Sequence, residues 1–263
     1  MIYPHQQRAI DYITGKFKTD PDVHALIISG SIAHGLNNAQ SDVDINIIVS
    51  NDFYEQKNNA GDLTYWETAA DFYDEGYFDG KYITLDYLDL VSKQGNEPTR
   101  FALHDSIIAF DKTGQVSDYI KKIGMYNEEK AQENTIRFLS QLEAWKWYST
   151  EALKRQNRYL LDTSVSKLIL FSGRLILLDN KMFFPYHKWF MKSLENAPQK
   201  PHDLMNTIDK LLNCKSEENI NALYQMIKDH RNWANGLKFR WGSYFLHDIE
   251  TVWMREEEFI ENL

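Results

Sequence analysis

Two short stretches decide the fold: residues 23–31 read VHALIISGS, and residues 42–49 read DVDINIIV. The first is rich in branched apolar residues and ends at Gly30, which is typical of a buried strand followed by a sharp turn. The second alternates polar and apolar residues, which predicts a half-buried strand. Asp42 and Asp44 then lie on its polar face.

The remaining sequence separates into a mixed part and a helical part. Apolar spacings of three and four predict an amphipathic helix over residues 4–18, and alternation predicts further strands at 82–87 and 106–110. After about Gly114 the pattern is helical throughout. The helices expected there cover residues 116–123, 128–154, 158–179, 187–196, 202–213, 217–235 and 243–261.

This change of pattern predicts two domains. We place the first at residues 1–118 and the second, a C-terminal helical bundle, at residues 119–263. The fold class expected is therefore α/β of the α+β kind, because strands are confined to the first half of the chain.

Composition narrows the classes of function. The 263 residues carry a formal charge of -9, which opposes broad binding to nucleic acid or to an anionic membrane surface. The single cysteine, Cys214, excludes an intrachain disulfide and suits a reducing compartment. No apolar run is typical of a secretory signal or a membrane span, so we expect a cytoplasmic protein.

The two motifs have complementary chemistry. Glycine permits close backbone approach, and N–H groups at the turn after the first strand, with the Ser31 hydroxyl, can hold a terminal phosphate. Asp42 and Asp44, two residues apart on a strand, project from one face about 6 to 7 Å apart. Hard oxygen ligands so arranged suit Mg²⁺, and a pair of such ions can stabilise an in-line displacement at phosphorus.

A third carboxylate is expected near this pair, either as another metal ligand or as the base that accepts a proton from an attacking hydroxyl. Asp86 is our candidate, because it falls on the polar face of the strand expected at 82–87. Asp89 is the alternative, but it lies beyond a break in the alternation and is expected to open a helix.

A family resemblance now becomes visible: Gly30-Ser31, ten intervening residues and Asp42-Val43-Asp44 resemble the signature of the DNA polymerase beta-like nucleotidyltransferase superfamily. The resemblance covers roughly residues 20–112, and the helical remainder more loosely resembles the companion domain of small antibiotic nucleotidyltransferases. It implies a mixed sheet with flanking helices. It also implies two Mg²⁺ ions and transfer of a nucleoside monophosphate, with Gly30 and Ser31 binding the triphosphate and Asp42, Asp44 and Asp86 forming the metal and catalytic site.

Two further residues are candidates for nucleotide binding. His34 follows the phosphate turn and can touch a phosphate oxygen, although it can equally support the turn. Lys188 lies in a polar and aromatic cluster at the start of a predicted helix and can grip the triphosphate.

The expected reaction moves AMP from ATP, or another nucleoside monophosphate from its triphosphate, to a hydroxyl of a small molecule such as an aminoglycoside-like antibiotic. The absence of a template-handling region and the acidic charge favour such an acceptor over nucleic acid. Adenylylation of a protein partner and nucleotide binding without turnover are the alternatives. No motif in the sequence specifies the acceptor, the base or the oligomeric state.

Overall fold

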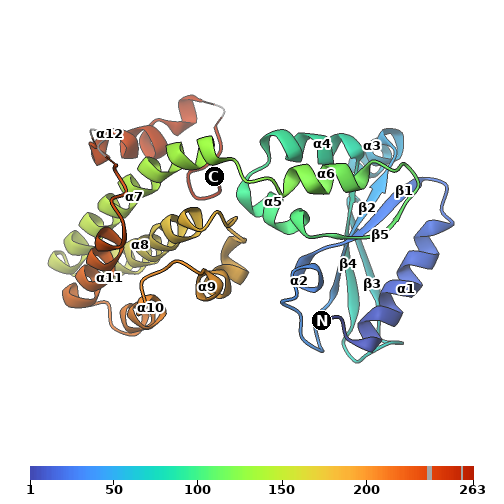
Figure 1. Ribbon diagram of the computed structural model, residues 1–263, viewed down its shortest axis with the longest axis horizontal. Coiled ribbons are helices and arrows are strands. Elements are labelled where there is room, and N and C mark those ends of the chain that lie inside the picture. The colour runs from blue at the N-terminus through green and yellow to red at the C-terminus, as the bar shows by residue number, and fades with distance from the viewer. Residues whose placement is uncertain (236–238, 256) are drawn as a thin grey trace. The chain divides into compact units, whose positions relative to one another are not determined.

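The computed structural model describes residues 1–235, 239–255 and 257–263, which form two compact units, Met1–Met125 and Tyr126–Leu263 (Figure 1). The first unit contains a mixed sheet with flanking helices, and the described part of the second contains helices and loops. The expected fold class is confirmed. No described helix is both long enough and apolar enough to cross a membrane.

The sheet of the first unit has five strands in the order β3-β4-β2-β1-β5. The strands are β1 (Val23–Ile28), β2 (Val43–Val49), β3 (Thr64–Thr68), β4 (Tyr77–Ile83) and β5 (Ile107–Asp111). β2 and β4 are parallel, whereas β1 runs antiparallel to β2. The end of β1 and the beginnings of β2 and β4 therefore meet at the same edge of the sheet.

Six helices of the first unit lie between and around these strands. They are α1 (Pro4–Lys18), α2 (Gly30–Ala33), α3 (Asn51–Asn59), α4 (Leu85–Gln94), α5 (Glu97–His104) and α6 (Val116–Ile123). α1 forms as predicted, with proline at its amino end, where a missing N–H is tolerated.

The two faces of the sheet bury different residues, because successive side chains of a strand point to opposite sides. On one face Ile13 and Phe17 of α1 pack with a core that includes Val43 of β2. On the other face residues of α4 and α6 pack with Ile48, near the far end of β2. Nearer the start of β2, that second face carries Asp44, so one end of it is apolar and covered while the other is polar.

The helices of the second unit are built around their own core. They are α7 (Glu128–Lys154), α8 (Arg158–Asp179), α9 (Tyr186–Asn196), α10 (Leu204–Asn213), α11 (Glu217–His230), α12 (Trp241–Phe245) and the single turns η1 (Leu246–Glu250) and η2 (Val252–Met254).

Arg174 is 1% exposed, and its guanidinium carbon lies 4.4 Å from the ring centroids of both Phe138 and Phe184. It also donates to the carbonyls of Glu261 and Leu263, so its role is structural.

The strand expected at residues 82–87 was wrong. β4 ends at Ile83, and the Thr84 hydroxyl accepts a hydrogen bond from the Tyr87 N–H at 3.1 Å, which caps α4. This local cap outweighs the alternating pattern, so Asp86 lies on a helix. β3 was not predicted, because it is a short edge strand with partly exposed residues on both faces.

The helix expected at residues 243–261 was also wrong. The chain there forms α12, η1 and η2 in succession, and residue 256 lies outside the described residues. The preceding helix, expected at 217–235, ends at His230. The other long helices, including α7 and α8, have the bounds that the periodicity predicted.

A substitution at Gly173 tests how tightly α8 packs on α9. A Cβ at this position would lie 2.3 Å from Cζ of Phe190 and 2.8 Å from Cδ1 of Leu194. We expect Gly173→Ala to destabilise the second unit by about 1–2 kcal/mol, because overpacking outweighs the gain in helix propensity. Gly15 in α1 has nothing within 4 Å, so Gly15→Ala should stabilise the first unit by about 0.5–1 kcal/mol. Urea unfolding of both variants measures the difference, and equal effects would contradict it.

Candidate active site

The turn between β1 and α2 is packed directly against β2. The Ser29 N–H donates to the Asp44 carbonyl at 2.9 Å. Gly30 has a φ of 62°, a left-handed conformation that glycine adopts readily. A Cβ at Gly30 would lie 1.8 Å from Oδ2 of Asp44, so the carboxylate occupies the space of the missing side chain. The two sequence motifs therefore form one structure.

Three aspartates gather at this edge of the sheet. Asp42 comes directly before β2, and Asp44, two residues later, shares its face. Asp44 is also the register partner of Asp79 on the parallel strand β4. Partners on neighbouring strands present their side chains to the same face, with the strands about 4.8 Å apart. Asp79, which the sequence analysis did not identify, is therefore the third carboxylate of the site.

The Tyr77 phenol lies close to these carboxylates. Its pKa is raised first by the hydrogen bond of its phenol to Asp42 and by the charge of that carboxylate. Burial and the negative charges of Asp79 and Asp44 raise the pKa further. One phenol therefore experiences all three carboxylates, and such a concentration of negative charge favours a bound cation.

The loop that joins the two motifs is anchored by α1 and by the β3–β4 connection. Gln6 is fully buried, and its Nε2 donates to the carbonyls of Asn38 at 2.8 Å and Ser41 at 3.2 Å. The hydroxyl of Tyr73 donates to the same Ser41 carbonyl at 3.0 Å. Because Asp42 is the next residue, these bonds hold the backbone that carries it.

Ser31 has a buried hydroxyl with no hydrogen-bond partner among the described residues. An unsatisfied buried group costs about 1–3 kcal/mol, and in a native fold it often marks a functional position. By contrast, the neighbouring Ser29 hydroxyl accepts a bond from Nδ2 of Asn46 at 2.9 Å and is structural. The nucleotide-binding role of Gly30 and Ser31 stays a prediction.

The residues at this edge fit a divalent metal of the magnesium type. All three aspartates offer hard oxygen donors, which Mg²⁺ prefers, and it usually takes only one or two carboxylates together with water and substrate oxygens. Asp42 and Asp44 are half-buried and Asp79 is exposed, so solvent and substrate can reach the remaining coordination positions.

Asp86 does not join this group. It lies in the first turn of α4, beyond the end of β4 at Ile83, whereas Asp79 lies near the beginning of β4. Residues 79 and 83 are already about 13 Å apart along the strand, and Asp86 comes three residues after Ile83. The Asp86 carboxylate accepts a hydrogen bond from Nδ2 of Asn51 at 2.8 Å. Its expected position on a strand face was wrong, and its metal or catalytic role stays a prediction that this position does not favour.

The other two predicted nucleotide ligands lie in different surroundings. The His34 side chain is 5% exposed and stacks on Phe101, with ring centroids 4.3 Å apart. Burial, with the nearby His104 as the next cause, lowers the pKa of His34, so the ring is neutral at pH 7. Lys188 is exposed on α9 in the second unit, with Nζ 5.6 Å from the Trp189 ring centroid. Both nucleotide-binding roles stay predictions.

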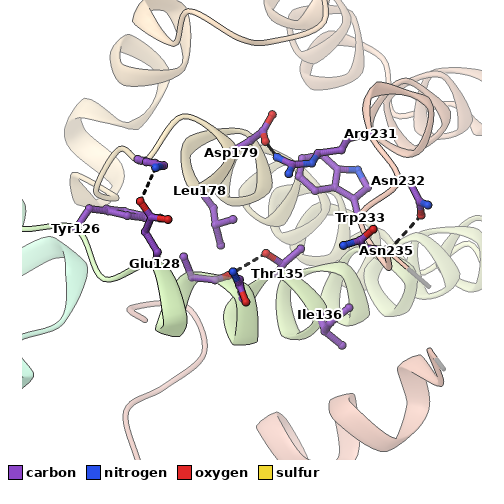
Figure 2. Close-up of a pocket in the computed structure, with 13 residues that line it drawn as sticks. Tyr126, Glu128, Thr135, Ile136, Leu178, Asp179, Arg231, Asn232, Trp233 and Asn235 are labelled. Carbon is purple, nitrogen blue, oxygen red and sulfur yellow. Dashed lines mark hydrogen bonds and ion pairs between the residues drawn. The ribbon is translucent and has the colours of Figure 1, made fainter. Parts of the chain in front are cut away.

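A hollow of about 650 Å³ lies within the second unit (Figure 2). The charged residues that line it form two ion pairs: Lys181 binds Glu128 at 2.5 Å, and Arg231 binds Asp179. Because these charges neutralise one another, the hollow is a weaker candidate for phosphate chemistry than the carboxylate edge of the first unit.

Comparison with known proteins finds a family match within the first unit. Residues 10–112 match the family described as "Nucleotidyltransferase domain", and this range includes the β1–α2 turn and all three carboxylates of the sheet edge. No curated protein matches the chain. Among solved structures, it is similar to a nucleotidyltransferase-like protein from Exiguobacterium sibiricum 255-15, at 14% identity and a TM-score of 0.48, covering 95% of this chain and 81% of that one.

The close approach of Gly30 to Asp44 can be tested with two glycines that share a positive φ. Gly30→Ala places a methyl group on the Asp44 carboxylate, whereas Gly35, with a φ of 66°, has nothing within 4 Å. We expect Gly30→Ala to weaken Mn²⁺ binding by about tenfold or more, a loss of about 1.4 kcal/mol. Gly35→Ala carries the backbone strain alone and should change the affinity by less than about threefold. Titration calorimetry measures both, and an equal loss would show that strain is responsible.

Proposed function

The chain carries a nucleotidyltransferase domain of the DNA polymerase beta-like superfamily over residues 10–112, and from this premise we propose that it transfers a nucleoside monophosphate to a hydroxyl of a small molecule. ATP is the proposed donor and pyrophosphate the proposed leaving group. The observation that carries this proposal is the convergence of Asp42, Asp44 and Asp79 beside the Gly30 turn.

Each residue of the site has a proposed task. The Gly30-Ser31 turn binds the terminal phosphates through its backbone N–H groups. Asp42, Asp44 and Asp79 would hold two Mg²⁺ ions, which supply charge neutralisation at the reacting phosphate. The hydrogen bond from the Tyr77 phenol orients Asp42. Most of the catalysis then comes from positioning, since phosphoryl transfer needs little covalent help from the protein.

Asp79 is proposed to act also as the base. It is the most exposed of the three carboxylates, so an acceptor hydroxyl can approach it from solvent. As the acceptor oxygen forms its bond to the α-phosphorus, the hydroxyl proton passes to a carboxylate oxygen of Asp79. The bond between the α-phosphorus and the bridging oxygen breaks at the same time, and pyrophosphate leaves with that electron pair.

The acceptor side of the site favours a small cationic molecule. Trp66 is the register partner of Asp79 on β3, it is 68% exposed, and its ring stacks on Tyr77 with centroids 6.3 Å apart. An exposed indole beside a group of carboxylates can bind an aminosugar through ring stacking and cation–π contacts. The neighbouring Glu67 lies on the opposite face of the sheet, where it binds Lys16 of α1.

Removal of individual carboxylates tests the reaction and separates the two candidates for the third position. We expect Asp44→Asn and Asp79→Asn to lower pyrophosphate release by about 100-fold or more, because each removes a metal ligand or a base. Asp86→Asn, the matched control, should retain activity within about threefold, since the Asp86 carboxylate is bound by Asn51 on α3, away from the sheet edge.

The assay combines nucleoside triphosphates and Mg²⁺ with a panel of aminoglycosides, lincosamides and candidate protein partners. A large loss in Asp86→Asn with none in Asp79→Asn would restore the original assignment of Asp86. Nucleotide binding without pyrophosphate release over the whole panel would identify a regulator instead of an enzyme, and labelled AMP on a protein would replace the small-molecule acceptor.

Trp66 offers a separate test of the acceptor side. We expect Trp66→Ala to raise the KM for the acceptor about five- to tenfold, with the KM for ATP unchanged, because loss of a stacking contact costs about 1 kcal/mol. Trp253, which is 79% exposed in the second unit, provides the matched control. A rise in the KM for ATP instead would place the nucleotide base, not the acceptor, on Trp66.

A further inference from the structure

Two histidines and an aspartate converge where the end of α5 meets the end of α2. His104 is the last residue of α5, Asp105 follows it, and His34 closes α2. Nδ1 of His104 lies 3.0 Å from Oδ1 of Asp105, and Nδ1 of His34 lies 3.5 Å from Oδ2 of the same carboxylate. The ligand atoms of the three residues all lie within 4.8 Å of one another.

From this cluster we propose a second metal site, specific for Zn²⁺ or a similar borderline divalent cation. It is separate from the carboxylates at the sheet edge, and its existence does not depend on the proposed reaction. Imidazole nitrogens suit Zn²⁺, Ni²⁺ and Cu²⁺, whereas Mg²⁺ prefers oxygen alone. The chain would thus hold two kinds of metal in sites of different chemistry.

The dimensions of the cluster fit a tetrahedral ion. Bonds of about 2.0–2.1 Å to each ligand place neighbouring ligand atoms about 3.3 Å apart. The two histidine-to-carboxylate distances, 3.0 Å to Oδ1 and 3.5 Å to Oδ2 of Asp105, are close to that size. For one carboxylate oxygen to bind the ion with both rings, the Asp105 carboxylate must turn and the two imidazoles, whose ring centroids are 5.0 Å apart, must move together. Three protein ligands leave a fourth position for water.

The burial of the cluster distinguishes it from an ordinary surface ion pair. The His34 side chain is 5% exposed, and its Nε2 is buried with no hydrogen-bond partner among the described residues. The Asp105 side chain is 58% exposed, so an ion can enter from solvent on that side. The stacking of His34 on Phe101 fixes the ring plane before an ion arrives.

An ion here would join the end of α5 to the nucleotide-binding turn. The His34 N–H donates to the Gly30 carbonyl at 3.2 Å, which connects the proposed ligand with the residue that packs on Asp44. Bound Zn²⁺ would therefore restrict the movement of this turn relative to the end of α5. A ligand that binds only the folded state also raises stability by mass action.

The test is titration of Zn²⁺ into the metal-stripped full chain in the presence of excess Mg²⁺, which occupies oxygen-only sites. We expect one Zn²⁺ per chain, and we expect His104→Ala and Asp105→Asn each to weaken its binding by about tenfold or more. His247→Ala is the matched control, because Nδ1 of His247 lies 3.0 Å from Asp248, the same contact without a second histidine. Asp44→Asn should leave Zn²⁺ binding unchanged.

Three results would overturn the proposal: no Zn²⁺ uptake in excess Mg²⁺, equal uptake in His104→Ala and Asp105→Asn as in the unaltered chain, or loss of uptake in Asp44→Asn, which would assign the ion to the carboxylate edge. Far-UV circular dichroism checks the fold of each variant. If His104→Ala fails to fold, the exposed Asp105 still decides the question through Asp105→Asn.

Discussion

The contact between Gly30 and the Asp44 carboxylate is the constraint on which the rest of the site depends. The space that a Cβ would fill at Gly30 is taken by Oδ2 of Asp44, and the Ser29 N–H binds the Asp44 carbonyl. A carboxylate can approach a backbone this closely only where a side chain is missing. The turn and the strand are thereby joined into a single rigid edge.

The face of the sheet that carries Asp44 has an apolar end, which helices cover, and an acidic end, which stays accessible. Ala25, Ile48 and Ile83 are buried at the far end under α4 and α6, where apolar burial provides stability. The near end carries Asp44 and its partner Asp79, which gain nothing from burial and remain accessible. The apolar and the acidic ends are therefore four residues apart along the same strands, from Asp44 to Ile48 and from Asp79 to Ile83.

The three carboxylates at this edge concentrate negative charge in one place. Three carboxylates in one place repel each other unless a cation is bound, and the hydrogen bond to Asp42, followed by the Asp42 charge, burial and the charges of Asp79 and Asp44, raises the pKa of Tyr77. The oxygen-only edge and the histidine cluster at His34 differ in donor type, so the two proposed sites would select different cations. The net charge of -9 agrees with metal binding and with a cationic acceptor.

The sequence alone was sufficient for the parts of the protein that local physics controls. Helical periodicity predicted the bounds of α1, α7 and α8, since the apolar spacing that makes a helix amphipathic lies within one continuous segment. Alternation predicted β2, and with it Asp42 and Asp44 on one face. The family resemblance that these motifs carry implied nucleotidyl transfer, and the match over residues 10–112 agrees with it.

Tertiary structure decided which distant residues join those motifs. Asp79 is adjacent to Asp44 only because β4 pairs with β2 in parallel, and strand pairing is not encoded in any single segment. Asp86 had the better local pattern, yet the Thr84 cap turned that pattern into a helix. His104 and Asp105 likewise meet His34 only through the packing of α5. Local sequence thus determined elements such as β2, α7 and α8 and the placing of Asp42 and Asp44 on one face, while strand register and packing, which act between residues far apart in the chain, brought Asp79 and the histidine cluster into place.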